Sequence, residues 1–436
     1  MRLTVKEIAR ITNGSITGDP LIEVEGISTD SRTLLPRELF VPIIAERNGH
    51  EFISNAVAQG ASAHLYSQGN PYGNAIKVND TLTALHSLAR FSRSKIPGDV
   101  VAITGSVGKT TTKDMLFSCI RELDNIHVSK LSYNNEIGLP LTILSADETT
   151  KHLVLEMGAR GPGQIAELCN LATPNIGIVT RVNAAHTEFF QDEEEIAETK
   201  GALIESLPIT GTAILNNDDD RVRKMASRTK ANIITFGFKD AVIIATDVFI
   251  DENLNTRFRI NSPWGTQEIS LNVPGVHNVS NAMAAIGGGL SMGYRLEDIC
   301  DPLSRVKLSP MRMDSRYLID GTLILDDSYN ANPTSMNAAI DTIMTSNRPN
   351  KIAVVGTMAE LGEISQEEHE AIGDRLTKSG ISWVSVGEKK YGGASVETWR
   401  DALSFIRNQD LIGEEVVILI KGSRVAGLDQ LADALK

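Results

Sequence analysis

Cysteine is scarce in this sequence. Its 436 residues include three cysteines, Cys119, Cys169 and Cys300, which stand far apart. They form no CxxC pair and no Cys/His metal spacing, so neither a disulfide framework nor a zinc site is predicted. We expect each to be a small buried apolar residue in a protein of a reducing compartment.

Long apolar runs and a secretion signal are also missing. No uninterrupted apolar stretch is long enough to cross a bilayer, and we find no repeat or low-complexity segment. The opening residues, MRLTVKEIARITNG, predict a short amphipathic helix and not a signal peptide. We therefore expect a cytoplasmic protein without a membrane partner.

Positive charge is in deficit as well. The formal net charge is −13 at pH 7, which disfavours nucleic acid as the main partner, because phosphate backbones require clustered Lys and Arg. A local pocket can still bind an anionic nucleotide. With 42% hydrophobic and 22% charged residues the chain is typical of folded globular proteins, and its length favours two to three domains.

Strand and helix patterns divide the chain into three α/β blocks. The first contains strand patterns at residues 38–44 and 61–66 and helical patterns at 50–59 and 81–94, and it ends near the Pro-Gly-Asp turn at 97–99. The second and third blocks each contain several predicted strands. The second has strands at 100–104, 152–156, 175–182, 212–216 and 232–238, then an antiparallel appendage at 256–261 and 266–273. The third has strands at 322–327, 351–356, 383–387 and 415–421.

These patterns predict an α/β fold of three domains. The expected boundaries are 1–97, 98–312 and 313–436. Strands that alternate with helices indicate a mostly parallel sheet in the central block and a second α/β layer arrangement in the last block.

A glycine-rich turn follows the first strand of the second block. Its residues are Gly105, Ser106, Val107, Gly108, Lys109, Thr110 and Thr111. Backbone N–H groups of such a turn and the following helix N-terminus can hold a polyphosphate, with the lysine on the outer phosphates and the first threonine on Mg²⁺. The usual G-x-x-x-x-G-K-[ST] spacing fails, because its first glycine falls at Ile103. A solvated turn without a ligand is the competing interpretation.

Two polar residues follow predicted strands of the same sheet. Glu156 ends one strand and His186 follows the next, and open α/β sheets bind ligands at the carboxyl ends of their strands. A buried carboxylate there is costly unless it is paired or bound to a metal. Taken alone, a salt-bridged glutamate and a structural histidine are the more common outcomes.

Lys200 lies in a predicted helix at residues 194–206. Its helical neighbours three and four residues away are apolar, so no local ion pair explains it. By pattern alone we expect its side chain to reach solvent along the apolar surface, with a functional role as the alternative.

Several blocks together resemble the Mur ligase family. They lie at residues 104–113 (TGSVGKTTTK), 134–140 (NNEIGLP), 156–158 (EMG), 183–186 (NAAH), 274–281 (PGVHNVSN), 326–333 (DDSYNANP), 356–362 (GTMAELG) and 421–424 (KGSR). The resemblance runs from about residue 28 to 424. It is strongest for the branch that joins D-alanyl-D-alanine to UDP-N-acetylmuramoyl-tripeptide in peptidoglycan precursor synthesis.

The resemblance implies a fold and a reaction. An N-terminal domain binds the UDP-sugar peptide, a central P-loop domain binds ATP, and a C-terminal Rossmann-like domain closes over the nucleotide. The peptide carboxylate attacks the γ-phosphate, and the free amine of D-alanyl-D-alanine then attacks the acyl phosphate. A monomer is expected, with no nucleic-acid partner.

The resemblance also implies roles for single residues. ATP contacts fall on the seven residues of the turn and on Asn281, Arg312, Asp327, Tyr329 and Asn330. Catalytic roles fall on Lys109, Lys200, His186 and Arg312, and Mg²⁺ ligands, for two ions, on Thr110, Glu156 and His186. Substrate contacts fall on Ser31, Arg32, Asn134, Asn135, His277 and Asn332. Lys200 matches a family lysine that is often carbamylated.

Other interpretations of these segments stay open. Asn278 also suits a helix cap, and the stretch 329–333 also suits a turn and a helix start. Met311 stands where the family often has glycine. A relative with a different amine substrate is the nearest alternative function, although no diamino-acid motif is seen near the Asn-Pro region. A P-loop switch or transporter motor would need a separate Walker-B-like aspartate.

Overall fold

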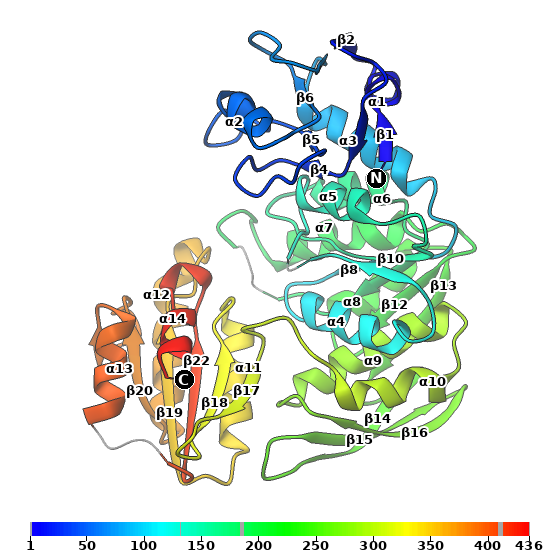
Figure 1. The fold of residues 1–436 in the computed structure, drawn as a ribbon. Helices are drawn as coiled ribbons and strands as arrows, with labels where there is room; N and C mark the ends of the chain where they lie inside the picture. The colour runs from blue at the N-terminus through cyan, green and yellow to red at the C-terminus, as the bar shows by residue number, and fades with distance from the viewer. Residues whose placement is uncertain (1, 131, 184–186, 409–412, 436) are drawn as a thin grey trace. The chain divides into compact units, whose positions relative to one another are not determined.

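The computed structural model describes residues 2–130, 132–183, 187–408 and 413–435 (Figure 1). Strands and helices alternate along most of the chain, so the predicted α/β class is confirmed. The chain forms two compact units. One comprises residues 1–102, 123–157 and 166–175, and the other comprises residues 103–122, 158–165 and 176–436.

The first unit begins with a small sheet of order β2-β7-β6-β5-β4. Its strands are β2 (Ser15–Thr17), β4 (Ile27–Ser28), β5 (Leu39–Phe40), β6 (Ala63–Tyr66) and β7 (Ala75–Lys77). Its helices are α1 (Val5–Thr12), α2 (Ile53–Ala58) and α3 (Thr81–Arg93), and β1 (Arg2–Thr4) pairs antiparallel with β3 (Glu23–Glu25). The predicted opening helix starts later than expected, because Thr4 and Glu7 form a capping box.

The same unit continues with strands and helices that follow the glycine-rich turn at residues 105–111 in the sequence. These are β9 (Ile126–Val128), α5 (Gly138–Ser145), β10 (His152–Glu156) and most of α6 (Gln164–Ala172), with β8 (Val100–Thr104) at the division between the units. Strands β9 and β10 pair in parallel, and β10 is buried along its whole length. The predicted strands at 100–104 and 152–156 are confirmed.

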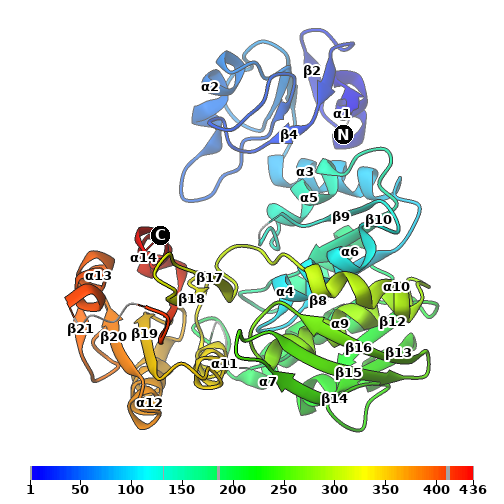
Figure 2. The same cartoon turned by 60° about the horizontal axis from the view of Figure 1, so that its bottom comes forward.

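The second unit carries the sheet β16-β15-β14-β13-β12-β11. Its strands are β11 (Ile176–Val179), β12 (Thr212–Asn216), β13 (Asn232–Gly237), β14 (Ile243–Ile250), β15 (Thr256–Ser262) and β16 (Gly265–Leu271). Its helices are α4 (Lys109–Ile120), α7 (Glu193–Glu205), α8 (Asp220–Lys224), α9 (His277–Ser291) and α10 (Leu296–Cys300). The pairing is parallel from β11 to β14 and antiparallel from β14 to β16, so the predicted appendage is confirmed. Helices α4 and α9 pack on each other (Figure 2).

The C-terminal sheet of the second unit has the order β17-β18-β22-β19-β20-β21. Its strands are β17 (Asp314–Tyr317), β18 (Leu323–Asp327), β19 (Asn350–Gly356), β20 (Ser382–Val386), β21 (Ser395–Val396) and β22 (Val416–Lys421). Helices α11 (Pro333–Met344) and α12 (Ser365–Lys378) pack on one face, and α13 (Trp399–Asn408) and α14 (Asp429–Ala434) on the other (Figure 1). Strands β18 to β21 run in parallel, as expected for a Rossmann-like arrangement.

The scarce cysteines behave as predicted, since all three are buried and none of them forms a disulfide. In the described part of the chain, no helix combines the length and the apolar character needed to cross a bilayer.

Candidate active site

The glycine-rich turn between β8 and α4 can hold only glycine at two positions. Gly105 has a φ of +149°, and a Cβ there would lie 2.0 Å from Thr180 Oγ1. Gly108 has a φ of +83°, and a Cβ would lie 2.3 Å from Asn281 Oδ1. Both backbone conformation and space therefore exclude larger residues. The turn is shaped by the side chains behind it as well as by its own sequence.

Hydrogen bonds hold this turn in one geometry. Thr180 Oγ1 donates to the carbonyl oxygen of Val107 (2.6 Å), and Ser106 Oγ donates to that of Asn183 (2.9 Å). Lys109 Nζ donates to the carbonyl oxygen of Gly105 (2.7 Å), so the cation lies over the loop at the N-terminus of α4. A preformed turn with a cation and a helix N-terminus is suited to bind a polyphosphate. Its hydrogen bonds argue against the competing interpretation of a loosely held, solvated turn.

Arg312 reaches this loop from the linker that precedes β17. Its Nη2 lies 3.3 Å from Thr110 Oγ1, and its guanidinium lies 4.0 Å from the ring centroid of Tyr329. Its Nε is buried and has no hydrogen-bond partner. A guanidinium fixed by an aromatic ring, with a donor to spare, is suited to bind a phosphate oxygen.

The end of β18 gathers several of the predicted nucleotide contacts. Lys421 is 1% exposed and donates to Asp327 Oδ2 and to the carbonyl oxygen of Asn330. The other oxygen of Asp327, Oδ1, accepts from the backbone N–H of Met313 (3.1 Å). The structure thus joins Asp327 and Asn330 to the linker that carries Arg312.

Helix α9 begins at His277, with Val276 as its N-cap. Asn278 donates to the carbonyl oxygen of Pro274 (2.7 Å) and accepts from Asn281 Nδ2 (3.0 Å), so its interpretation as a simple helix cap is wrong. Asn281 Oδ1 thereby faces Gly108 of the loop. Burial lowers the pKa of the His277 imidazole, which favours the neutral form of the ring.

Lys200 lies inside the second unit, on α7. Its residue is 3% exposed, so the expectation that it reaches solvent is wrong. Burial, followed by the charge of Lys109, lowers its pKa to about 7. The reason for the error is tertiary: other segments cover this face of the helix, so the side chain is enclosed. A buried amine that titrates near neutrality is a candidate for chemistry.

In the first unit, the structure brings two of the predicted residues together. Asn134 Nδ2 donates to Glu156 Oε1 (2.7 Å), and Glu156 is 1% exposed at the end of β10. Asn135 Oδ1 accepts from the backbone N–H of Gly138 (2.8 Å) and so fixes the start of α5. The amide of Asn134 thus holds the carboxylate of Glu156 in place.

The remaining predicted residues are placed more simply. Arg32 is tied to Asp30 by an ion pair of 2.6 Å, and its side chain is 85% exposed, whereas Ser31 beside it is buried. Asn332 caps α11 and forms a capping box with Ser335, so the interpretation of this stretch as a helix start is confirmed. His186 lies outside the described residues.

Sequence reasoning assigned no role to three residues that shape the site, although Lys421 belongs to one of the family-like blocks. Thr180 faces Gly105 and holds the loop, Asp114 Oδ2 accepts from the backbone N–H of Ser309 (2.7 Å), and Lys421 pairs with Asp327. Lys421 ends the buried strand β22, so the strand-end rule applied to Glu156 would have found it. Thr180 and Asp114 act through backbone groups far away in the chain, and the sequence gives no sign of them.

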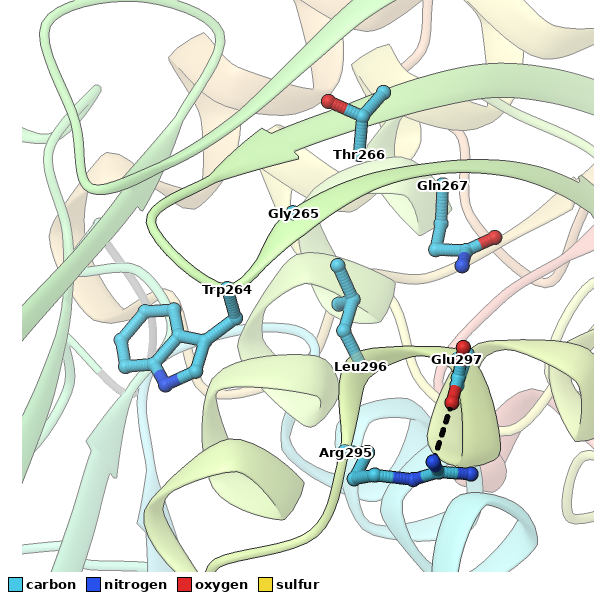
Figure 3. A pocket seen from close by; sticks show the side chains of 7 residues that line it. All are labelled: Trp264, Gly265, Thr266, Gln267, Arg295, Leu296 and Glu297. Atoms are coloured by element: carbon cyan, nitrogen blue, oxygen red, sulfur yellow. Dashed lines mark ion pairs between the residues drawn. The ribbon is translucent and has the colours of Figure 1, made fainter.

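A hollow of about 290 Å³ lies elsewhere in the second unit, beside the β15–β16 turn (Figure 3). It is lined by Trp264, Gly265, Thr266, Gln267, Arg295, Leu296 and Glu297. The guanidinium of Arg295 already pairs with Glu297 (2.8 Å) and Asp298 (2.9 Å). The residues that line the hollow include neither a phosphate-binding turn nor an unpaired cation. We therefore do not assign the nucleotide to this hollow.

Comparison with known proteins identifies two family modules in the chain. Residues 103–288 match the Mur ligase middle domain, and residues 311–434 match the Mur ligase glutamate ligase domain. The UDP-N-acetylmuramoyl-tripeptide–D-alanyl-D-alanine ligases of Escherichia coli K12 and Bacillus subtilis 168 are 33% and 34% identical, over 100% of this chain and 98% of each relative.

Solved structures agree with these matches. A crystal structure of MurF from Acinetobacter baumannii has a TM-score of 0.92 at 28% identity and covers 100% of this chain and 99% of its own. MurF ligase from Thermotoga maritima in complex with ADP has a TM-score of 0.85 at 28% identity and covers 94% of this chain and 97% of its own. The chain belongs to the Mur ligase family.

Proposed function

We propose that the chain is an ATP-dependent ligase that joins D-alanyl-D-alanine to UDP-N-acetylmuramoyl-tripeptide in peptidoglycan precursor synthesis. Two relatives of that name match it over its whole length, and a structural neighbour of the same kind was solved with ADP. The names of these relatives favour D-alanyl-D-alanine over the different amine that we considered as an alternative.

One observation carries the proposal on physical grounds. The linker places Arg312 beside Thr110 of the glycine-rich turn, with a buried Nε that lacks a partner. Lys109 lies over the same turn. Two cations that face one phosphate loop are what a reaction needs when charge develops on a transferring phosphoryl group.

The reaction balances as two substitutions. A carboxylate oxygen of the tripeptide attacks the γ-phosphorus of ATP, the bond to the β,γ-bridging oxygen breaks, and ADP leaves with that electron pair. The amine nitrogen of D-alanyl-D-alanine then attacks the acyl carbon. The amine loses a proton, and inorganic phosphate leaves. Lys109 and Arg312 stabilise the charge on the phosphoryl oxygens in both steps.

The residues Thr110 and Glu156, to which the family resemblance assigns Mg²⁺, are oxygen donors. A buried threonine hydroxyl at Thr110 and the carboxylate of Glu156 are the kinds of ligand that Mg²⁺ takes, usually beside phosphate oxygens and water. Among the described residues, no three His, Cys, Asp or Glu side chains gather as an all-protein metal cage. When bound, Mg²⁺ would neutralise phosphate charge. Asn134 would orient Glu156 for it, and the assignment of His186 to a second ion stays a prediction.

We also propose that Lys200 is carbamylated. With its pKa lowered to about 7, much of its amine is neutral at physiological pH and can attack the carbon of CO₂. The nitrogen loses a proton and the product is an anionic carbamate. Because Lys109 disfavours a second cation nearby, the same field would favour this anion.

Domain boundaries and substrate contacts complete the proposal. We place the boundaries near residues 97 and 312. The middle-domain match at residues 103–288 falls inside the second domain, and the glutamate ligase domain match at 311–434 begins two residues before the third. The roles of Ser31 and Arg32 toward the uridine diphosphate follow from the family resemblance alone. The same holds for Asn135, His277 and Asn332 toward the substrates.

A phosphate-release assay tests the proposal. Purified protein with ATP and Mg²⁺ should release phosphate rapidly only when both UDP-N-acetylmuramoyl-tripeptide and D-alanyl-D-alanine are present. Replacing the dipeptide by a diamino acid should abolish the stimulation. Equal phosphate release without either substrate would refute a ligase and favour a nucleotide-hydrolysing switch.

A further inference from the structure

A strained turn follows strand β19 in the second unit. Glu360 has a φ of +60°, a conformation that glycine adopts freely and glutamate rarely does. Gly362, two residues later, also has a positive φ of +55°. A non-glycine residue persists in this region only when surrounding contacts hold it, so strain of this kind points to a functional constraint.

Contacts from within the C-terminal sheet hold this turn from behind. The backbone N–H of Met358 donates to His369 Nε2 (2.9 Å), and that of Ala359 donates to Ser423 Oγ (3.0 Å). His369 is fully buried on α12, and its Nδ1 lies 2.6 Å from the carbonyl oxygen of Ser365. Because both ring nitrogens are engaged, the imidazole fixes the start of the turn in one position.

The front of the turn contacts two segments outside that sheet. Glu360 Oε1 pairs with Arg160 Nη2 (3.0 Å), and its carbonyl oxygen accepts from the backbone N–H of Glu188 (3.3 Å). Thr187 Oγ1 donates to the carbonyl oxygen of Leu361 (3.0 Å). One strained residue therefore uses both its side chain and its backbone in the contact.

The two contacted segments have a shared property in the sequence. Arg160 stands four residues after Glu156, and Thr187 directly follows His186. The proposed function gives metal roles to Glu156 and His186. A turn that contacts the segments after both residues can fix the position of each segment when the reaction occurs.

We propose that Glu360 is a positioning residue. It docks the turn at residues 357–362 on Arg160 and Thr187–Glu188, and it thereby orders the segments that follow the proposed metal ligands in the sequence. This inference rests on the proposed ligase function. The Arg160 side chain is 68% exposed, and exposed ion pairs add little to stability. The contact should therefore matter for turnover more than for folding.

Glu360→Asn removes the charge but keeps a residue that tolerates positive φ, so the turn can still form. We expect kcat to fall about tenfold, the size typical of coupled contact pairs, with the KM for ATP changed less than about twofold. The melting temperature should stay within a few degrees. Glu363→Gln, at an exposed acidic residue three positions later, is the matched control and should leave kcat unchanged.

A charge swap gives the decisive measurement. Arg160→Glu and Glu360→Arg should each lower kcat, and the double variant should recover most of the loss because the pair is restored with reversed charges. Additive losses, or full kcat in Glu360→Asn, would overturn the inference. Absence of substrate-dependent phosphate release in the unaltered protein would instead overturn the proposed function, so the two failures are distinguishable.

Discussion

The phosphate loop (residues 105–111) and the linker (residues 309–313) both contain left-handed backbone, but they obtain it in opposite ways. The loop has glycine at its two positive-φ positions, where a Cβ would collide with Thr180 and Asn281. The linker has methionine at its positive-φ positions, with φ of +61° at Met311 and +53° at Met313. In the first the local sequence permits the shape, and in the second tertiary contacts impose it.

This difference decides what the sequence could reveal. Glycine, lysine and threonine at fixed spacing after a buried strand predicted the loop, because each residue type is required by sterics or by the ligand. The linker geometry comes from the backbone N–H of Tyr329, which donates to the carbonyl oxygen of Met311 (3.2 Å), and from Asp327, which accepts from Met313. No local pattern encodes those contacts.

The largest expected effect lies in the loop. Lys109→Met keeps the length of the side chain but removes the cation over the turn, so acyl-phosphate formation should fall about a thousandfold. Phosphate release with both substrates measures it. Lys224→Met, at an exposed lysine on α8, is the control. Turnover within about tenfold of the unaltered protein would contradict the role of Lys109.

A second test concerns the lysine whose pKa the loop helps to lower. Lys200→Met should reduce turnover about a hundredfold, in the range of other lost electrostatic groups. Added short carboxylic acids should restore part of the activity if a carbamate is the active form. With ¹³C-labelled bicarbonate, NMR should detect a carbamate carbon in the unaltered protein and not in the variant. Its absence from both would refute carbamylation.

The same variant should be less active but more stable to unfolding than the unaltered protein. In bicarbonate-free buffer, Lys200 binds a proton more weakly in the folded state, where its pKa is about 7, than in the unfolded state, where it is near 10.5. Unfolding free energy of the unaltered protein should thus rise with pH between those values. Lys200→Met should be about 4 kcal/mol more stable at pH 7, and this gain should vanish near pH 10.5. Denaturant unfolding at several pH values measures it.

Lys200 also shows where sequence reasoning reached its limit. The apolar neighbours on its helix are equally compatible with a side chain that reaches solvent and with one that is enclosed, and only packing from other segments separates these. By contrast, the buried strands β8, β10 and β12 were predicted with their observed bounds, since continuous apolar runs between polar turns leave few alternatives.

Arg312 extends the comparison from the linker to the loop. Arg312→Lys keeps the charge but loses the planar group over Tyr329 and the Nε donor. We expect kcat/KM for ATP to fall about tenfold, a loss typical of a stacked charge-assisted contact. Arg305→Lys, an exposed arginine paired with Asp301, should change nothing. Unchanged ATP kinetics in Arg312→Lys would show that the linker does not read the phosphates.

The smallest effect tests the linker conformation itself. Met311→Gly removes the strain of a left-handed methionine, worth roughly 1–2 kcal/mol, but gives the unfolded chain more freedom, worth roughly 0.4–1 kcal/mol. The net result should be a stabilisation of roughly 0 to 1.6 kcal/mol in thermal unfolding. Met344→Gly, at the end of helix α11, is the matched control and should instead destabilise by about 1 kcal/mol. Equal destabilisation by both variants would mean that the contacts of the Met311 side chain outweigh its backbone strain. The linker would then be held by side-chain packing, and the contrast with the loop would be one of contacts and not of conformation.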